Sequence, residues 1–149
     1  MTRRLVIGIG NPLRGDDGVG ALLAEQAAMF TAAEPDGPAV RSVQQLTPEL
    51  AEELAQLEQV LFIDAWQAPV GAVPQLLALS PAAASADTHQ LDPGALLAVS
   101  QVLYGRTPGA HLLLVPGQAF EHGPVLSAEL QAALPQARTL LRQWLSGHA

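Results

Sequence analysis

Residues 5–20 read LVIGIGNPLRGDDGVG. The segment begins with the apolar run Leu5–Ile9, closed by glycine, asparagine and proline, which is typical of a strand buried on both faces in a parallel sheet. From Gly18 to Met29 the apolar side chains recur at near-helical spacing, which predicts a helix. The segment therefore predicts a buried strand that leads through a glycine-rich loop into a helix.

The rest of the chain continues this alternation. Expected strands cover residues 40–43, 60–63, 73–79 and 112–115, and expected helices cover residues 47–57, 92–103 and the region after Ser127. Pro74 favours an edge position for the strand over 73–79, and Pro135 either kinks the last helix or divides it. The alternation predicts an α/β protein with a mostly parallel sheet covered on both faces. No linker or internal repeat divides the chain, so residues 1–149 are expected to form a single domain.

Capping residues mark three of the expected helix starts. Thr47 precedes Pro48 and Glu49, which is typical of an N-cap, a proline at the first helical position and an early acid. Asp92 precedes Pro93 in the same way, and Ser127 is a candidate N-cap for the last helix.

The composition excludes several classes of protein. The chain has no Cys, which removes disulfide scaffolds, thiolate metal sites, iron–sulfur clusters and cysteine nucleophiles. It also has no Lys, and its net charge is -7, so nucleic acid is not an expected partner. Its longest apolar runs are about four residues against the ~20 of a membrane-spanning helix, and no signal peptide is recognisable. We therefore expect a soluble, cytoplasmic, monomeric protein without nucleotide or haem.

The first loop does not fit a nucleotide-binding loop. Leu13 stands where a dinucleotide fingerprint requires its third glycine, and the adjacent carboxylates Asp16 and Asp17 follow where a pyrophosphate needs backbone donors. No Gly-Lys-Ser/Thr follows, which excludes a Walker A loop. Two interpretations of the acids remain: a loop built to present two functional carboxylates, or an N-cap followed by an ordinary first-turn acid.

Two further residues are candidates by position. Asp64 comes directly after the apolar run Val60–Ile63, and α/β enzymes often place functional groups at the carboxyl ends of their strands. His89 lies in the loop expected over residues 80–90. The alternative interpretations are a turn residue for Asp64 and a surface side chain for His89. Position alone therefore indicates two candidate carboxylates and a histidine at loop ends, without a short metal-binding signature.

Four segments of this sequence resemble, in the same order, the [NiFe]-hydrogenase maturation endopeptidases. They are residues 7–20 (IGIGNPLRGDDGVG), Leu61–Ala65, Thr88-His89, and residues 117–123 (GQAFEHG) with Leu126-Ser127. The first segment is long and specific, the fourth is moderately specific, and the likeness spans nearly the whole chain. Members of that family cleave a short C-terminal extension from the hydrogenase large subunit after nickel insertion. The resemblance implies a three-layer α/β/α fold with a twisted, five-stranded mixed sheet whose fourth strand is antiparallel.

The resemblance also implies a metal-binding set. Carried over by position, the ligands are Asp17, Asp64 and His89, and the metal is nickel. The family's first acid is Glu in some members and Asp here, and Asp16 is adjacent, so either acid of the first loop is a candidate for that ligand. We expect Asp16 to assist catalysis by orienting the loop or by contacting substrate.

Two mechanisms agree with this set of ligands. In one, the site recognises the nickel already inside the substrate, and a water activated by a carboxylate attacks the peptide. In the other, the protease holds its own metal, which polarises the carbonyl as in a zinc peptidase. The sequence lacks the HExxH helix of the zincins, so we favour nickel supplied by the substrate.

Other loop residues are candidates for substrate binding. Arg14 is expected to contact the substrate's carboxyl terminus or an acidic site on it, and Glu121 and His122 to border the substrate groove. The alternatives are a solvated arginine and a turn. Two other functions are also kept: a non-catalytic chaperone of the nickel-loaded large subunit, and a nucleotide- or phosphate-binding α/β domain.

Overall fold

The computed structural model describes residues 3–82 and 91–147. The strands are β1 (Arg4–Ile9), β2 (Ala39–Val43), β3 (Gln59–Gln67), β4 (Gln75–Leu79) and β5 (Gly109–Gly117). The helices are α1 (Val19–Phe30), α2 (Leu50–Leu54), α3 (Pro93–Tyr104) and α4 (Ala128–Leu145), with a 3₁₀ turn, η1 (Gly15–Gly18), before α1. The predicted order of strands and helices is confirmed.

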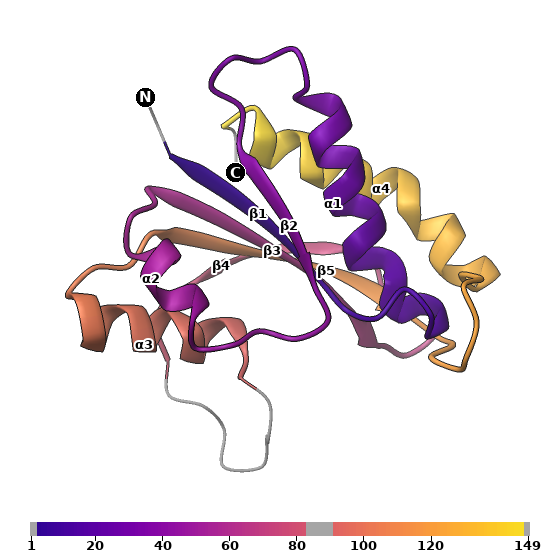
Figure 1. The fold of residues 1–149 in the computed structure, drawn as a ribbon. Coiled ribbons are helices and arrows are strands. Elements are labelled where there is room, and N and C mark those ends of the chain that lie inside the picture. The colour runs from indigo at the N-terminus through magenta and orange to yellow at the C-terminus, as the bar shows by residue number, and fades with distance from the viewer. Residues whose placement is uncertain (1–2, 83–90, 148–149) are drawn as a thin grey trace.

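The strands form one twisted sheet in the order β2-β1-β3-β5-β4 (Figure 1). β1 pairs in parallel with β2 and β3, and β3 pairs in parallel with β5. β4 pairs antiparallel with β5 at the edge of the sheet, and Pro74 precedes its first residue. The predicted α/β class, the mixed sheet and the antiparallel fourth strand are therefore confirmed.

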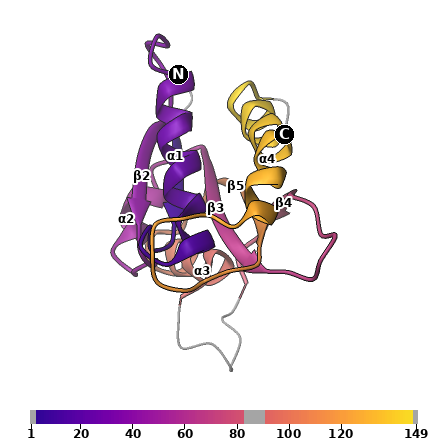
Figure 2. The same ribbon diagram turned by 90° about the vertical axis from the view of Figure 1, so that its right-hand side faces the viewer.

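Helices cover both faces of the sheet. α1 and α4 lie side by side on one face, and α2 and α3 cover the other (Figures 1 and 2). The alternation along β1 explains the two layers, because Val6 packs under α1 and α4 whereas Leu5 and Ile7 pack under α2 and α3. Both faces of the central strands are thus buried, as their uninterrupted apolar runs predicted.

The central strands β3 and β5 are both longer than the strands predicted over residues 60–63 and 112–115. β3 continues from Ile63 to Gln67 and remains paired with β5, so Asp64 lies within β3, opposite Leu114, and not after the strand. On its other side β3 pairs with β1 only as far as Ile63, opposite Gly8. Asp64 therefore lies one residue beyond the part of β3 that pairs with β1, which leaves that side of β3 unpaired at this position.

The helix predicted over residues 47–57 is shorter than expected. A turn begins at Thr47, where Leu50 N–H bonds to the Thr47 carbonyl, but regular α-helix covers only Leu50–Leu54. The N-cap of α2 is Glu49, without a side-chain cap, so the predicted N-cap at Thr47 is wrong. The two other predicted caps are present: Asp92 accepts from Ala95 N–H, and Ser127 accepts from Leu130 N–H. The last helix, α4, is continuous through Pro135. Across residues 3–82 and 91–147, no helix has the length and apolarity needed to cross a bilayer.

α1 packs unusually close to the strand before it. A Cβ added at Gly8 would meet the Gly20 carbonyl, and a Cβ added at Gly20 would meet the Ile9 carbonyl. Glycine at both positions therefore allows the first turn of α1 to lie directly against β1. This contact places the loop between them at the carboxyl edge of the sheet.

Candidate active site

A pocket lies at the carboxyl edge of the sheet, where β1, β2 and β3 end, with a volume of about 600 Å³. Its lining residues are Ile9, Gly10, Asn11, Arg14, Asp17, Gln44, Gln45, Asp64, Gln67 and Phe120. The structure thus brings together three of the predicted site residues, Arg14, Asp17 and Asp64. It does not describe His89, which lies in the undescribed segment 83–90.

The first loop holds the Asp17 carboxylate in place. Gly10 has φ +132°, a conformation that favours glycine, and the chain then turns so that Asn11 N–H donates to Asp17 Oδ2 at 2.7 Å. Asp17 N–H in turn donates to the Arg14 carbonyl at 3.1 Å. The side chain of Asp17 is half-buried. The loop therefore orients Asp17 through backbone contacts within a few residues.

Asp64 faces the same pocket from β3. Burial raises the pKa of the Asp64 carboxyl, and the negative charge of Asp17 raises it further. The Ala65 backbone N–H offsets part of this shift, and the resulting pKa is about 7. Asp17 and Asp64 thus form an interacting pair of carboxylates, one of which is poised to exchange a proton near neutral pH.

Asp16 points away from this pair. It is 0% exposed and does not line the pocket. Its carboxylate accepts hydrogen bonds from the backbone N–H groups of Gln118 (2.7 Å), Ala119 (3.0 Å) and Ser127 (2.7 Å), and from the Ser127 hydroxyl (2.7 Å). Burial raises the pKa of Asp16, but these hydrogen bonds outweigh burial and hold the pKa below its usual value.

These contacts decide between the interpretations of Asp16. The N-cap of α1 is Gly18, without a side-chain cap, so the interpretation of Asp16 as an N-cap is wrong. Of the two roles expected for Asp16, its contacts support orienting the loop, because all four hydrogen bonds join η1 to the segment after β5. The Asp16 backbone N–H strengthens the same connection by donating to the Ala119 carbonyl at 2.8 Å.

The segment after β5, residues 118–127, covers one side of the first loop. Phe120 lines the pocket, whereas the side chains of Glu121 and His122 are exposed and do not line it. The two loops are joined again where Gly123 N–H donates to the Leu13 carbonyl at 2.7 Å. Phe120 is therefore the residue of this segment that lines the candidate site.

Sequence reasoning missed most of the pocket's polar wall. Asn11, Gln44, Gln45 and Gln67 line it beside the two acids. A signal was present for Gln44 and Gln45, because they directly follow the strand expected over residues 40–43 and so belong to the same edge as Asp64. Gln67 was hidden because β3 continues beyond the apolar run that predicted it.

The donor set fits a cation in part. The carboxylates of Asp17 and Asp64 supply oxygen ligands, and a divalent cation between them would relieve the repulsion that adds to the raised pKa of Asp64. Within the described part of the chain, no three His, Cys, Asp or Glu side chains form a metal-binding group. A third protein ligand would therefore have to come from outside those residues.

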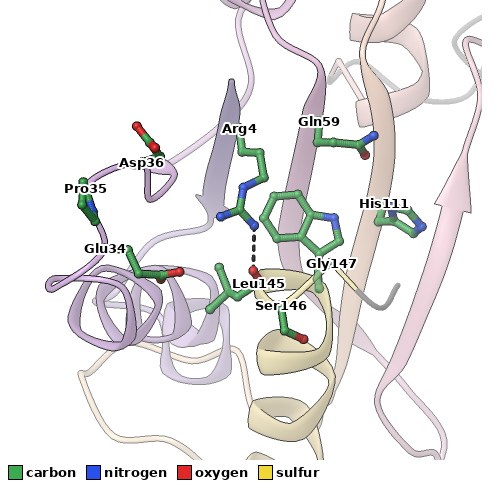
Figure 3. Close-up of a pocket in the computed structure, with 10 residues that line it drawn as sticks. Arg4, Glu34, Pro35, Asp36, Gln59, His111, Leu145, Ser146 and Gly147 are labelled. Carbon is green, nitrogen blue, oxygen red and sulfur yellow. Dashed lines mark hydrogen bonds between the residues drawn. The ribbon is translucent and has the colours of Figure 1, made fainter. Parts of the chain in front are cut away.

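A second pocket, of about 680 Å³, lies at the opposite end of the sheet and holds none of the predicted site residues (Figure 3). Arg4 at its centre is engaged in the fold. Its Nη1 donates to the Leu145 carbonyl at 2.7 Å (Figure 3). Its guanidinium lies 5.6 Å from the centroid of the Trp144 ring. A cation at this position stabilises the C-terminal end of α4.

The fold is shared with several maturation proteases. The structure matches the [NiFe] hydrogenase maturation protease HycI from Thermococcus kodakarensis, with a TM-score of 0.70, 21% sequence identity, and coverage of 95% of this chain and 91% of that one. It matches the hydrogenase maturating endopeptidase HybD from E. coli with a TM-score of 0.66 and 20% identity, over 97% and 94% of the chains. It matches the hydrogenase 2 maturation peptidase from Thaumarchaeota archaeon SCGC_AB-539-E09 with a TM-score of 0.68 and 23% identity, over 99% of both chains. No protein-family model and no curated protein sequence matches the chain. These structural matches confirm the fold that the sequence resemblance implied.

Proposed function

We propose that this protein is an endopeptidase that removes the C-terminal extension from a [NiFe]-hydrogenase large-subunit precursor after nickel insertion. One observation carries the proposal: Asp17 and Asp64 meet in a polar pocket at the carboxyl edge of a sheet whose fold matches maturation proteases over nearly its full length. The sequence resemblance at residues 7–20 and 61–65 supports the same assignment.

In this proposal the substrate's nickel is the recognition mark. The carboxylates of Asp17 and Asp64 bind it as oxygen ligands, and His89 is the third ligand implied by the resemblance. Oxygen and imidazole donors suit a divalent transition metal that is already held by other ligands in the substrate. Arg14, which lines the same pocket, is placed to bind a carboxylate of the substrate.

Asp64 lines the pocket beside Asp17, and its ionised carboxylate, the form that a bound cation favours, is the candidate acceptor for the proton of a water. In the proposed step, the oxygen of a water attacks the scissile carbonyl carbon and the water's proton passes to the Asp64 carboxylate. The C–N bond then breaks, and the proton passes from Asp64 to the nitrogen of the leaving peptide. Asp17, held by Asn11 N–H, keeps the substrate in place through these steps.

Asp16 has a different part in the proposal. Its four hydrogen bonds leave no room for a ligand, so it acts on the reaction only through the positions of the two loops that it joins. We assign it as a positioning residue. Glu121 and His122 remain candidates for contact with the body of the large subunit, since both are exposed beside the pocket.

The test is intact-mass spectrometry of a nickel-loaded precursor, co-produced from the same source and incubated with this protein. We expect the wild type to release a single C-terminal peptide and the Asp64→Asn variant to release none. Asp36→Asn, which changes an exposed acid at the opposite end of the sheet, is the matched control and is expected to cleave normally.

Absence of cleavage by the wild type, with nickel shown to be present in the precursor, would contradict the proposal. A pull-down of the same mixture would then distinguish the alternative of a non-catalytic chaperone, which binds the precursor without cutting it, from a mismatched partner. A nucleotide or phosphate ligand is disfavoured, because Asp17 and Asp64 place negative charge where a phosphate would bind.

A further inference from the structure

Three glutamine side chains line the candidate active-site pocket beside the acids. Gln44 and Gln45 follow the end of β2, and Gln67 is the last residue of β3. All three are exposed, and within residues 3–82 and 91–147 none makes a side-chain hydrogen bond. Three primary amides therefore face one pocket with their donors and acceptors free.

The chemistry of this wall selects a class of ligand. A primary amide donates and accepts at the same time, which matches the N–H and C=O groups of a peptide main chain. An anionic ligand would need cations in place of the amides, and Arg14 is the one cation that lines the described pocket. The amides are also neutral, so they add no negative charge beside Asp17 and Asp64. The wall therefore suits an extended polypeptide.

The position of β2 provides a path for such a polypeptide. β2 lies at the edge of the sheet, and the only strand with which it pairs in the described structure is β1. Its outer edge thus keeps backbone donors and acceptors that an added strand can use. Val43, the last residue of β2, accepts from Gly10 N–H at 2.9 Å, and the chain continues directly into Gln44 and Gln45. An extended segment alongside β2 would therefore run into the pocket past both glutamines.

We infer that Gln44, Gln45 and Gln67 bind the main chain of the substrate's C-terminal segment, which enters along the free edge of β2. This inference rests on the proposed endopeptidase function and adds to it the part of the substrate that is recognised. Recognition through the main chain makes cleavage insensitive to most side chains of the extension. It also makes cleavage sensitive to the loss of a backbone N–H.

The first test replaces the amides. The triple variant Gln44→Met, Gln45→Met and Gln67→Met keeps the length of each side chain and removes its hydrogen bonds. Because three side chains lose their hydrogen bonds to the substrate, we expect KM for the nickel-loaded precursor to rise at least about tenfold, with kcat changed by less than about threefold. Gln101→Met, at an exposed glutamine on α3, is the matched control and is expected to behave as wild type.

Binding gives a second readout that does not depend on turnover. An Asp64→Asn background prevents cleavage but also lacks one proposed nickel ligand, so the glutamine substitutions are compared with Asp64→Asn alone. Relative to that background they should weaken the Kd for the precursor by the same factor as KM. Thermal unfolding of each variant checks that the fold is retained, which we expect because all three side chains are exposed.

The second test changes the substrate. Single alanine and single proline substitutions are made through the C-terminal extension, because proline removes one N–H whereas alanine removes only a side chain. Wild-type enzyme should tolerate most alanines and lose at least about tenfold in kcat/KM at two or more prolines. In the triple glutamine variant the penalty at those positions should shrink to less than about threefold, since the lost N–H no longer has a partner.

The outcomes separate the two proposals. Cleavage by the wild type, with KM and the proline penalties unchanged in the triple variant, would overturn the role of the glutamines and leave the endopeptidase standing. Strong alanine effects with mild proline effects would show side-chain recognition and would likewise overturn the inference. If the wild type does not cleave the precursor at all, both proposals fail together.

Discussion

Ser127 donates two hydrogen bonds to the carboxylate of Asp16 across 111 residues of chain, one from its backbone N–H to Oδ1 and one from its hydroxyl to Oδ2, each at 2.7 Å. The same hydroxyl oxygen accepts from Leu130 N–H at 3.1 Å, as the N-cap of α4. The turn that holds Asp17 is thereby connected to the start of the last helix. The geometry of the candidate site depends on this connection.

Asp16→Asn is expected to destabilise the protein by about 3 kcal/mol, measured by urea unfolding at pH 7, since it replaces a buried, fully paired acceptor with an amide that presents N–H groups to N–H donors. Asp36→Asn, at an exposed loop acid, should change stability by less than about 0.5 kcal/mol. Equal effects of the two substitutions would refute the structural role of Asp16.

The difference in stability between wild type and Asp16→Asn should depend on pH. The folded-state pKa of Asp16 is below its unfolded value of 3.8, so its contribution to stability is present above pH 3.8. That contribution is lost as pH falls through the folded-state pKa, where the native carboxylate takes up its proton. The difference in free energy of unfolding between wild type and Asp16→Asn should therefore narrow in acid.

Ser127→Ala should cost about 1–2 kcal/mol, because it removes both a donor to Asp16 and the side-chain cap of α4. Since the two residues share a hydrogen bond, the double variant with Asp16→Asn should lose less than the sum of the single losses, by at least about 0.5 kcal/mol. Chemical denaturation of wild type, the two single variants and the double variant completes this double-mutant cycle. If the two single losses of stability simply add up in the double variant, Asp16 and Ser127 are not coupled.

Asp64 should make stability depend on pH in the opposite direction from Asp16. Its carboxyl has a folded-state pKa of about 7 against 3.8 for the unfolded chain, so between these values the native state holds a proton that the unfolded state has released. The free energy of unfolding should consequently fall as pH rises from 4 to 7. Asp64→Asn removes this loss, so relative to wild type it should gain on the order of 2–4 kcal/mol between pH 4 and pH 8.

The stabilities of wild type and Asp64→Asn are compared by urea unfolding with a chelator present, since a bound cation would favour the ionised carboxylate.

Asp17→Asn should lower the pKa of Asp64, because it removes the negative charge that adds to the effect of burial. An NMR titration of the Asp64 carboxyl carbon in both proteins measures that shift directly. Parallel stability profiles for wild type and Asp64→Asn would contradict the raised pKa.

Gly20→Ala is expected to destabilise the protein by about 2–3 kcal/mol although alanine is the better helix former. A Cβ at this position would overlap backbone atoms of Ile9 and lie 2.8 Å from the Ile63 carbonyl oxygen. Gly94→Ala, in the first turn of α3, is the matched control, since its Cβ would meet its nearest neighbour at 3.4 Å. Thermal unfolding of the two variants should differ by several degrees, with Gly94→Ala at or above the wild-type Tm.

Local sequence was sufficient for much of the architecture. Apolar runs and helical spacing predicted the order of the elements, Pro74 predicted the edge position of β4, and Asp92 and Ser127 were correctly expected as caps. Each of these features depends on neighbours within a few residues, so the sequence nearby contains the cause. The sequence also predicted that Asp64 belongs to the functional edge of the sheet, because the carboxyl ends of parallel strands lie at a common edge, and Asp64 and Asp17 line one pocket there.

Other features depended on contacts that no local pattern encodes. Asp16 and Asp17 are adjacent and chemically identical, yet one accepts four hydrogen bonds from residues 118–127 and the other faces the pocket with Asp64. The extent of β3 followed from its pairing with β5, which carried the strand past its apolar run to Gln67. Sequence alone determined which elements form and in what order; only the tertiary structure decided which carboxylate is a support and which belongs to the site, because the donors that distinguish them lie more than 100 residues away and reach Asp16 only when the chain has folded.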